Sequence, residues 1–289
     1  MPELPEVEVL VRHLREVLPG RRIKSVTVRR AKVLGVTTVH ELSDELVGRN
    51  FSAVRRRGKY LLFDLEGPRR ASVTLVGHLG MTGRMYVQPA KTALPKHAAV
   101  VLRLDRGDFV FEDTRYFGRF TLDKSAVARL GPEPLANDFT VKGFAEALRH
   151  SSQAIKVKLL NQSLVAGIGN IYASEDLYRA GISPRRAART LTFPEVKRLW
   201  QAIREVLRQA IRGGSTVKLA FAPGANDGLY YFGSAASSST YEERLLVYDR
   251  AGKLCSRCQT PIRRLVQAAR STFFCPHCQA SPARRAGTQ

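Results

Sequence analysis

The sequence predicts an α+β protein: an N-terminal helix and a β-sandwich or barrel, followed by a helical region and a cysteine-rich C-terminal segment. Three patterns indicate this order. Short β-rich runs follow one another from Ile23 to about Leu122, the apolar spacing is helical from about residue 141 to Arg212, and all four cysteines lie within 24 residues. The chain has 289 residues and is 44% hydrophobic, which is enough for a substantial core.

The N-terminal half is expected to contain one helix and many short strands. Apolar residues at helical spacing begin after Pro5 and stop before Pro19-Gly20; they are Val7, Leu10, Val11, Leu14 and Leu18. The strand-like runs that follow include KSVTV, KYLLFDL, ASVTLVGHL, AVVLRL and DFVFED, with a hairpin turn expected at Arg106-Gly107. Many such strands are typical of a β-sandwich or a β-barrel.

The C-terminal half is expected to be helical, after a linker around residues 131–134. Helices are expected at 141–150, 153–163, 170–180 and about 194–212. We assign the apolar stripe of the last helix, Trp200 included, to the core. Residues 213–241 are rich in Gly, Ser and Ala and predict a long flexible loop.

The charge of the chain points to a polyanionic partner. Lys and Arg number 47 against 25 Asp and Glu, a formal charge of +22. This favours a nucleic acid without choosing DNA over RNA, and a merely basic protein is the alternative. The first residues are too acidic for a secretory leader and no apolar run could span a bilayer, so we expect a cytoplasmic protein.

The cysteines form two CxxC pairs, Cys255-Ser-Arg-Cys258 and Cys275-Pro-His-Cys278, separated by sixteen residues. This spacing is typical of tetrahedral zinc. Four thiolates leave no position for water, so the zinc is expected to be structural; a redox dithiol is the alternative. Arg263, Arg264 and Arg270 lie between the pairs and no acid follows Asp249, so this segment is expected to present cations to phosphates or simply to solvent.

The N-terminus offers a candidate nucleophile. Pro2 follows the initiator Met, whose removal would leave a free secondary amine that is partly unprotonated at neutral pH. Its attack on a sugar C1′ would expel a base and form an iminium. Glu3 and Glu6 are close enough in sequence to transfer protons, although a proline with nearby acids also commonly just begins a helix.

Several longer motifs extend along the chain. They are MPELPEVE at residues 1–8, Arg57-Gly58-Lys59-Tyr60, the run from His78 to Gly83, Thr114-Arg115-Tyr116-Phe117-Gly118, the run from Gly167 to Glu175, and the two CxxC pairs. Together they resemble the formamidopyrimidine-DNA glycosylase and endonuclease VIII family over nearly the whole chain. The resemblance implies an N-terminal β-sandwich domain over 1–133, a helix-two-turn-helix domain with a lesion-covering loop over 134–241, and a zinc finger over 242–289.

The resemblance implies catalytic roles near the N-terminus. Pro2 is the implied Schiff-base nucleophile and Glu3 the acid that assists sugar opening. Glu6 and Glu175 are implied to be supporting acids near the lesion. Lys59 resembles the lysine that contacts phosphate and assists catalysis, with a surface charge on a strand as the alternative.

A second set of residues is implied to bind DNA. Met81, Arg115 and Phe117 match residues that this family inserts into the duplex when a nucleotide is flipped, because an emptied stack needs an apolar wedge and a donor for the orphaned base. Core side chains and a surface charge are the alternatives. Further implied DNA-binding residues are His97, Lys156, Asn170 and Arg270; Asn170, at a helix start, could also be an N-cap.

Two departures from the family pattern bear on the substrate. Tyr116 stands where many members have Arg, and the loop from Gly213 to Tyr241 carries an apparent insertion, although Ser215, Thr216 and Lys218 fit the usual start of that loop. The resemblance implies a bifunctional DNA glycosylase and AP lyase of base-excision repair that removes oxidised purines by β,δ-elimination. An endonuclease VIII-type enzyme for oxidised pyrimidines and a non-catalytic zinc protein that binds damaged DNA are the alternatives.

The implied partner is double-stranded DNA with oxidised bases or abasic sites, and the implied cofactor is one structural zinc ion. A monomer at the bacterial nucleoid is expected.

Overall fold

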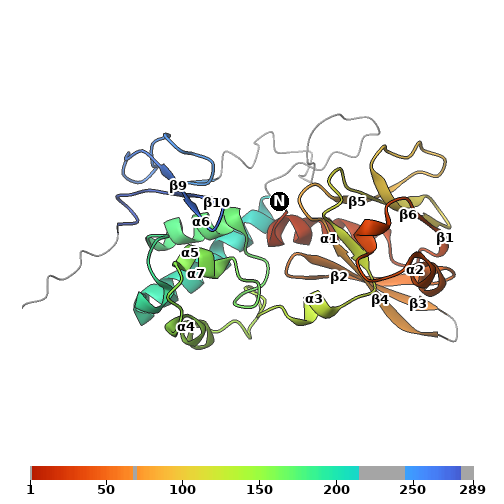
Figure 1. The fold of residues 1–289 in the computed structure, drawn as a ribbon, viewed down its shortest axis with the longest axis horizontal. Coiled ribbons are helices and arrows are strands. Elements are labelled where there is room, and N and C mark those ends of the chain that lie inside the picture. Colours follow the sequence, from red (N-terminus) through yellow and green to blue (C-terminus); the bar gives the residue numbers. More distant parts are fainter. Residues whose placement is uncertain (1, 68–69, 215–244, 281–289) are drawn as a thin grey trace, which may run out of the picture. The chain divides into compact units, whose positions relative to one another are not determined.

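The structure is a computed structural model that describes residues 2–67, 70–214 and 245–280. Within these ranges the chain forms two compact units, one over residues 2–129 and one over residues 130–213 together with 245–280 (Figure 1). We describe each unit by itself.

The first unit begins with helix α1 (Leu4–Val17) and contains two antiparallel four-stranded sheets. One sheet has the order β1 (Ile23–Val28), β6 (Ala98–Leu104), β7 (Asp108–Glu112), β5 (Arg84–Gln88). The other has the order β2 (Asn50–Arg57), β3 (Tyr60–Gly67), β4 (Arg70–His78), β8 (Arg119–Thr121). Short helices η1 (Ala31–Leu34), α2 (Val39–Leu46) and α3 (Ser125–Ala128) complete the unit.

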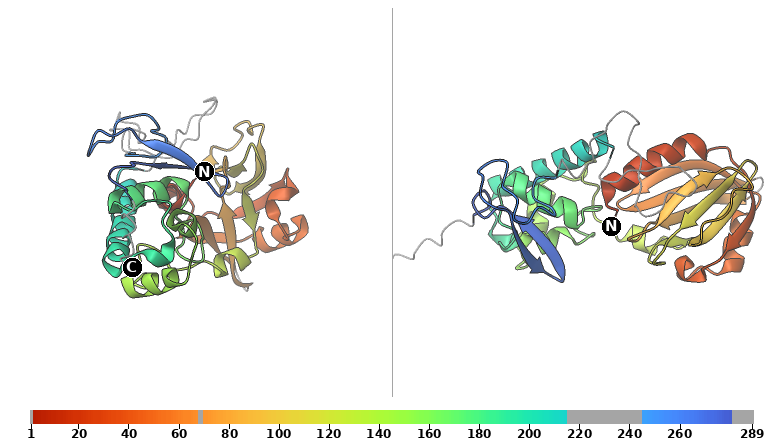
Figure 2. Two further views of the ribbon diagram at one scale, coloured as in Figure 1. Left: turned by 60° about the vertical axis from the view of Figure 1, so that its left-hand side comes forward. Right: turned by 90° about the horizontal axis from the view of Figure 1, so that it is seen from above.

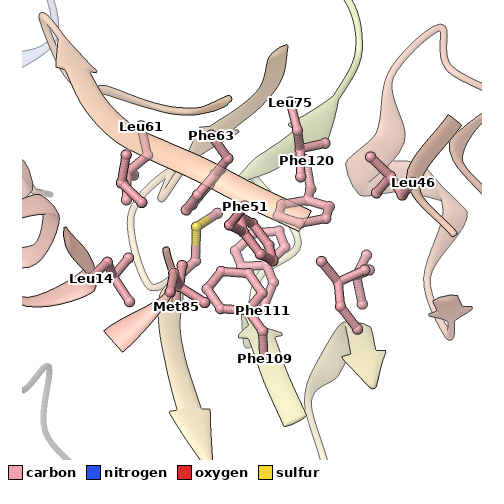
Figure 3. Packing of buried hydrophobic residues seen from close by; sticks show 14 of the residues in the cluster. Leu14, Leu46, Phe51, Leu61, Phe63, Leu75, Met85, Phe109, Phe111 and Phe120 are labelled. Carbon is pink, nitrogen blue, oxygen red and sulfur yellow. The ribbon is translucent and has the colours of Figure 1, made fainter. Parts of the chain in front are cut away.

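Phenylalanines from both sheets meet in one core, as the close view in Figure 3 shows. The ring of Phe63 on β3 lies 5.5 Å from that of Phe109 on β7, and Phe109 lies 6.0 Å from Phe120 on β8, centroid to centroid. Edge and offset contacts of this kind are preferred by aromatic rings. The core therefore joins the two sheets as a sandwich, which confirms the predicted fold class.

The Arg106-Gly107 turn between β6 and β7 is confirmed. Gly107 has φ +83°, and a Cβ there would lie only 2.6 Å from the carbonyl oxygen of Gln88. Both facts explain why glycine occupies this position, since other residues rarely adopt such a backbone conformation.

One prediction for this unit was wrong: residues 39–46 lie within the stretch expected to be β-rich, yet they form α2. Thr38 accepts a hydrogen bond from the N–H of Glu41, and Glu41 accepts one from the N–H of Thr38. This capping box starts the helix, and Leu42 and Leu46, four residues apart, bury its inner face.

The second unit consists mainly of helices α4 (Val141–Arg149), α5 (Ile155–Leu159), α6 (Asn170–Ala180) and α7 (Phe193–Arg212), with short η2 (Ala188–Thr190) (Figure 2). Helix α6 contacts both α7 and the hairpin of β9 (Arg263–Gln267) and β10 (Arg270–Phe274). No helix in the described part of the chain is both long and apolar enough to span a membrane.

Helix α5 is shorter than the 153–163 predicted. It ends at Leu159 because side chains just beyond it bond to the local backbone: Asn161 Oδ1 accepts from the N–H of Ser163, and Gln162 Nε2 donates to the carbonyl of Leu160. Trp200 lies at the edge of the core, half-buried, and its Nε1 donates to the Phe139 carbonyl at 2.7 Å.

Candidate active site and metal centre

The N-terminal residues are buried and held by the start of α1. Glu3 is the N-cap of this helix, and its N–H donates to Glu6 Oε2 at 2.8 Å within a capping box. Pro2 is buried, and Glu3 and Glu6 are each 1% exposed. The positive end of a helix stabilises carboxylates at this position. Two carboxylates that are close to the candidate nucleophile in sequence are thus held in place by the start of α1.

Lys59 lies in the two-residue turn between β2 and β3, where Gly58 has φ +57°. It is only 7% exposed. The neighbouring Arg56 donates through Nη1 to the Gly58 carbonyl at 3.1 Å and through Nε to Glu8 of α1 at 2.9 Å. Burial raises the pKa of Glu8, but hydrogen bonds from Arg56 and Arg12 outweigh it, so the pKa lies below its ordinary value. These contacts join α1 to the turn that carries Lys59.

His78, for which the sequence suggested no role, lies close to Lys59. It pairs with Tyr60 across β3 and β4, with ring centroids 4.7 Å apart, and its Nδ1 accepts the N–H of Gly80 at 3.1 Å. Burial, and then the charges of Lys59 and Arg119, lower the pKa of His78 to about 4. The imidazole is therefore neutral at physiological pH, and its remaining proton is assigned to Nε2.

The three predicted wedge residues lie on two loops that are packed together. Met81 is 39% exposed and Phe117 47% exposed, which argues against their being core side chains. Arg115 lies over the Phe117 ring, 4.8 Å from its centroid. Gly80, with φ +61°, lets the loops approach, since a Cβ there would lie 2.6 Å from the Gly118 nitrogen.

Asp113 organises these loops, and the sequence did not single it out. Its buried carboxylate accepts the N–H groups of Arg115 at 3.1 Å and Gly118 at 2.8 Å, and the hydroxyl of Thr82 at 2.5 Å. The first two bonds shape the loop with Arg115 and Phe117, and the third ties it to the loop with Met81. The sequence signal that could have identified Asp113 is its position as an acid directly before Thr114-Arg115.

The side chains of Tyr116 and His97 contact each other. The Tyr116 hydroxyl lies 3.4 Å from Nδ1 of His97, and the Arg30 guanidinium lies over the Tyr116 ring at 5.4 Å. Tyr116 has φ +52°, an uncommon conformation for a residue with a side chain.

In the second unit, Lys156 and Asn170 contact each other. The Lys156 ammonium donates to Asn170 Oδ1 and to the Ser271 carbonyl, and Asn170 Nδ2 donates to the same carbonyl at 3.0 Å. Lys156 is fully buried, whereas Arg270, beside Ser271, is exposed. Asn170 is the first residue of α6, and Gly169 is the N-cap.

Glu175 lies on α6, in the second unit, and holds the backbone that follows residue 245. Its carboxylate accepts the N–H groups of Leu246, Val247 and Tyr248 at 2.8–2.9 Å. Burial raises its pKa, and the three backbone bonds partly oppose that effect. Ser215, Thr216 and Lys218, together with most of the predicted loop, lie outside the described residues.

The four cysteines converge in the second unit. The Sγ atoms of Cys255, Cys258, Cys275 and Cys278 all lie within 4.8 Å of one another. The Sγ atoms of Cys255 and Cys278 are 3.8 Å apart, and those of Cys258 and Cys275 are 3.4 Å apart. A tetrahedral zinc ion with bonds of about 2.3 Å requires separations of about 3.8 Å, so the residues fit one structural zinc.

A β-sandwich that begins with a buried proline and two fixed carboxylates, in one chain with a helical unit that carries a four-cysteine metal site, is the arrangement expected of a zinc-finger enzyme. Family models agree along the chain: the formamidopyrimidine-DNA glycosylase N-terminal domain matches residues 1–120, its H2TH domain residues 130–220, and a zinc finger found in FPG and IleRS residues 252–280. The chain belongs to the formamidopyrimidine-DNA glycosylase family.

Individual relatives agree with this assignment. The formamidopyrimidine-DNA glycosylase of Symbiobacterium thermophilum is 43% identical, with 98% of this chain and 90% of the relative covered. A structure of MutM with DNA containing carbocyclic 8-oxo-G has a TM-score of 0.84 at 33% identity, covering 97% and 100%. Wild-type Lactococcus lactis Fpg with DNA containing an oxidised pyrimidine has the same TM-score, identity and coverage.

Proposed function

We propose that the protein is a bifunctional DNA glycosylase and AP lyase that excises oxidised purines, among them 8-oxoguanine and formamidopyrimidines. The observation that carries the proposal is the buried Pro2-Glu3 start of α1, with Glu6 bonded to Glu3 at 2.8 Å, in a chain of this family. Its substrate is double-stranded DNA with an oxidised base or an abasic site, and the protein acts as a monomer at the nucleoid.

In the proposed reaction the Pro2 nitrogen attacks C1′, and the bond from C1′ to the damaged base breaks. The base leaves with the proton that the Pro2 amine gives up, and Glu3 donates a proton to the ring oxygen as the sugar opens, which leaves an iminium between Pro2 and C1′. The iminium acidifies the neighbouring sugar protons, so β-elimination and then δ-elimination expel the two phosphates. The product is a one-nucleotide gap with phosphate ends.

Lys59 is proposed to contact phosphate beside the reacting sugar and to assist these steps. The position of Lys59 supports this role, because the turn that holds it is joined to α1 through Arg56 and Glu8. Glu6 supports Glu3 directly. For Glu175 the contacts favour a positioning role, since its carboxylate holds the backbone of residues 246–248.

The remaining predicted residues are proposed to bind the duplex. Exposed Met81 and Phe117, with Arg115 over the Phe117 ring, suit a wedge that replaces a flipped nucleotide. His97, Asn170 and Arg270 are proposed to contact the DNA backbone. Lys156, whose buried ammonium bonds to Asn170 and to the Ser271 carbonyl, is proposed to take part in DNA binding by positioning Asn170. The segment with Ser215, Thr216 and Lys218 is proposed to cover the flipped base, and the domain division at 133 and 241 also stays a proposal.

The zinc ion, held by the four cysteines, supplies folding energy and no catalytic step, because four thiolates occupy every tetrahedral position. It shapes the unit from which Arg270 extends.

Borohydride trapping on abasic DNA tests the lyase. We expect a covalent adduct with the wild type, none with Pro2→Gly, and mass spectrometry that locates the bond on Pro2. An adduct on an internal lysine, or the initiator Met still present on active enzyme, would contradict the mechanism. Binding without any adduct would instead support a non-catalytic zinc protein.

Two lesion duplexes test the substrate. We expect faster excision of 8-oxoguanine than of thymine glycol under single-turnover conditions. The Lactococcus lactis complex with an oxidised pyrimidine favours an endonuclease VIII-like activity as the second candidate. Faster removal of thymine glycol would establish that second candidate.

A further inference from the structure

One buried hydroxyl reaches the metal centre. Tyr178 lies on α6, is fully buried, and its hydroxyl oxygen lies 3.1 Å from Cys255 Sγ. The same oxygen is 3.5 Å from the Ser256 hydroxyl, at the limit of a hydrogen bond. Tyr178 belongs to neither the catalytic nor the DNA-binding set above.

The direction of this contact follows from the chemistry of the two groups. A zinc-bound cysteine is a thiolate and has no proton to donate, whereas the tyrosine hydroxyl carries one. The contact is therefore an O–H···S⁻ hydrogen bond, a charge-assisted bond about twice as strong as a neutral one.

The surroundings strengthen this bond. Four thiolates around one Zn²⁺ carry a net charge of −2, and Val247, Ile262 and Phe273 pack in the same buried cluster as Cys255 and Tyr178. A donor inside such a dry environment offsets more charge than it would in water.

Tyr178 is also held in place from its other side. The Arg257 guanidinium lies 4.4 Å from the centroid of the tyrosine ring, and its Nη1 donates to the Tyr178 carbonyl at 3.2 Å. Arg257 lies between Cys255 and Cys258. A residue between two metal ligands therefore also holds Tyr178, which contacts one of those ligands.

We propose that Tyr178 is a positioning residue of the zinc site: its hydroxyl stabilises the Cys255 thiolate and slows the loss of zinc. Hydrogen-bond partners of metal ligands commonly contribute a factor of about 10–100 in metal affinity. The metal centre and α6, which also carries Asn170 and Glu175, are thereby bonded to each other through one phenol.

The test is Tyr178→Phe in the full-length zinc-loaded protein, with Tyr172→Phe as the matched control, because Tyr172 is also fully buried on α6. Zinc release to excess 4-(2-pyridylazo)resorcinol is followed by absorbance. We expect release about 10-fold faster from Tyr178→Phe and unchanged release from Tyr172→Phe. Equal rates for Tyr178→Phe and wild type, or equal acceleration in both variants, would overturn the proposal.

A spectroscopic measurement separates the hydrogen bond from general loosening. In cobalt-substituted protein, loss of a donor to the thiolate is expected to shift the sulfur-to-cobalt charge-transfer band of Tyr178→Phe alone. Faster metal release with an unshifted band would mean that removal of the hydroxyl only loosens the packing around the site, and would also overturn the proposal.

Discussion

The guanidinium of Arg56 joins Glu8 to the turn that carries Lys59. Nε of Arg56 lies 2.9 Å from Glu8 Oε2, and the two side chains are 11% and 14% exposed. Because Glu8 lies two residues after Glu6 in α1 and Arg56 also bonds to Gly58, this ion pair links the helix that follows the candidate nucleophile to the turn that carries the candidate lysine. Little water competes for a pair this buried, so it is expected to matter more than a surface salt bridge.

We expect the coupling between Glu8 and Arg56 to be about 1–3 kcal/mol in a double-mutant cycle of Glu8→Gln and Arg56→Met, measured by urea unfolding. The pKa of Glu8 is lowered in the fold, so its contribution is present above the ordinary value of 4.5 and is lost as pH falls through the lowered pKa. Glu8→Gln should therefore flatten the acid side of the stability profile. Additive single-mutant effects would rule out the coupling.

His78 should make the fold sensitive to mild acid. Its pKa falls from 6.5 to about 4, so below pH 6.5 the unfolded chain binds a proton that the folded chain does not. The contribution of His78 to stability is therefore expected to fall between pH 6.5 and 4, by at most about 3 kcal/mol, and to change no further below that. Urea unfolding of His78→Gln should show a flatter profile in that window; identical slopes for the two proteins would contradict the assignment of a neutral imidazole.

Asp113→Asn should disorganise the wedge loops. An amide cannot accept from the Arg115 and Gly118 N–H groups with both of its polar atoms, so we expect a stability loss of about 1–3 kcal/mol. Fluorescence of 2-aminopurine opposite an abasic analogue should show weaker unstacking. The control is Asp105→Asn, whose carboxylate is exposed and accepts the backbone N–H of Arg22 at 3.3 Å. If both variants distort the duplex as the wild type does, Asp113 does not position the wedge.

The sequence predicted what depends on local pattern. The helical spacing after Pro5 predicted α1, the β-rich runs predicted the longer strands, and the two CxxC pairs predicted the metal site. The capping-box residues Thr38 and Glu41 would also have revealed α2, but surrounding β-rich runs obscured them.

Contacts between distant residues could not be predicted in the same way. Arg56 and Glu8 are 48 residues apart, and Tyr178 and Cys255 are 77 apart. Each of these residues is of a type that is common in a helix, a strand or a CxxC pair. Only the packed tertiary structure brings the two members of each pair together. His78 escaped notice for the same reason, because the charges that act on it, Lys59 and Arg119, are distant in sequence. Asp113 differs: two of its partners, Arg115 and Gly118, are close in sequence, so its position before Thr114 was a usable local signal.

Lys156 offers a test between two roles for a buried cation. The sequence motif favours a phosphate contact, whereas the structure buries the ammonium completely and bonds it to Asn170 and the Ser271 carbonyl. A lysine that neutralises a phosphate releases a counterion when the protein binds DNA. Its loss therefore reduces the magnitude of the slope of log K against log salt by about 0.9. A lysine that only positions Asn170 lowers affinity without changing that slope.

From the burial of Lys156 we expect the second outcome. Lys156→Met, checked for native circular dichroism, should bind a lesion duplex more weakly at every salt concentration with the wild-type slope. Arg270→Ala, which removes an exposed cation, should lower the slope by about 0.9. If Lys156→Met lowers the slope as much as Arg270→Ala does, the ammonium turns toward DNA on binding, and its bonds to Asn170 and Ser271 belong to the free protein alone.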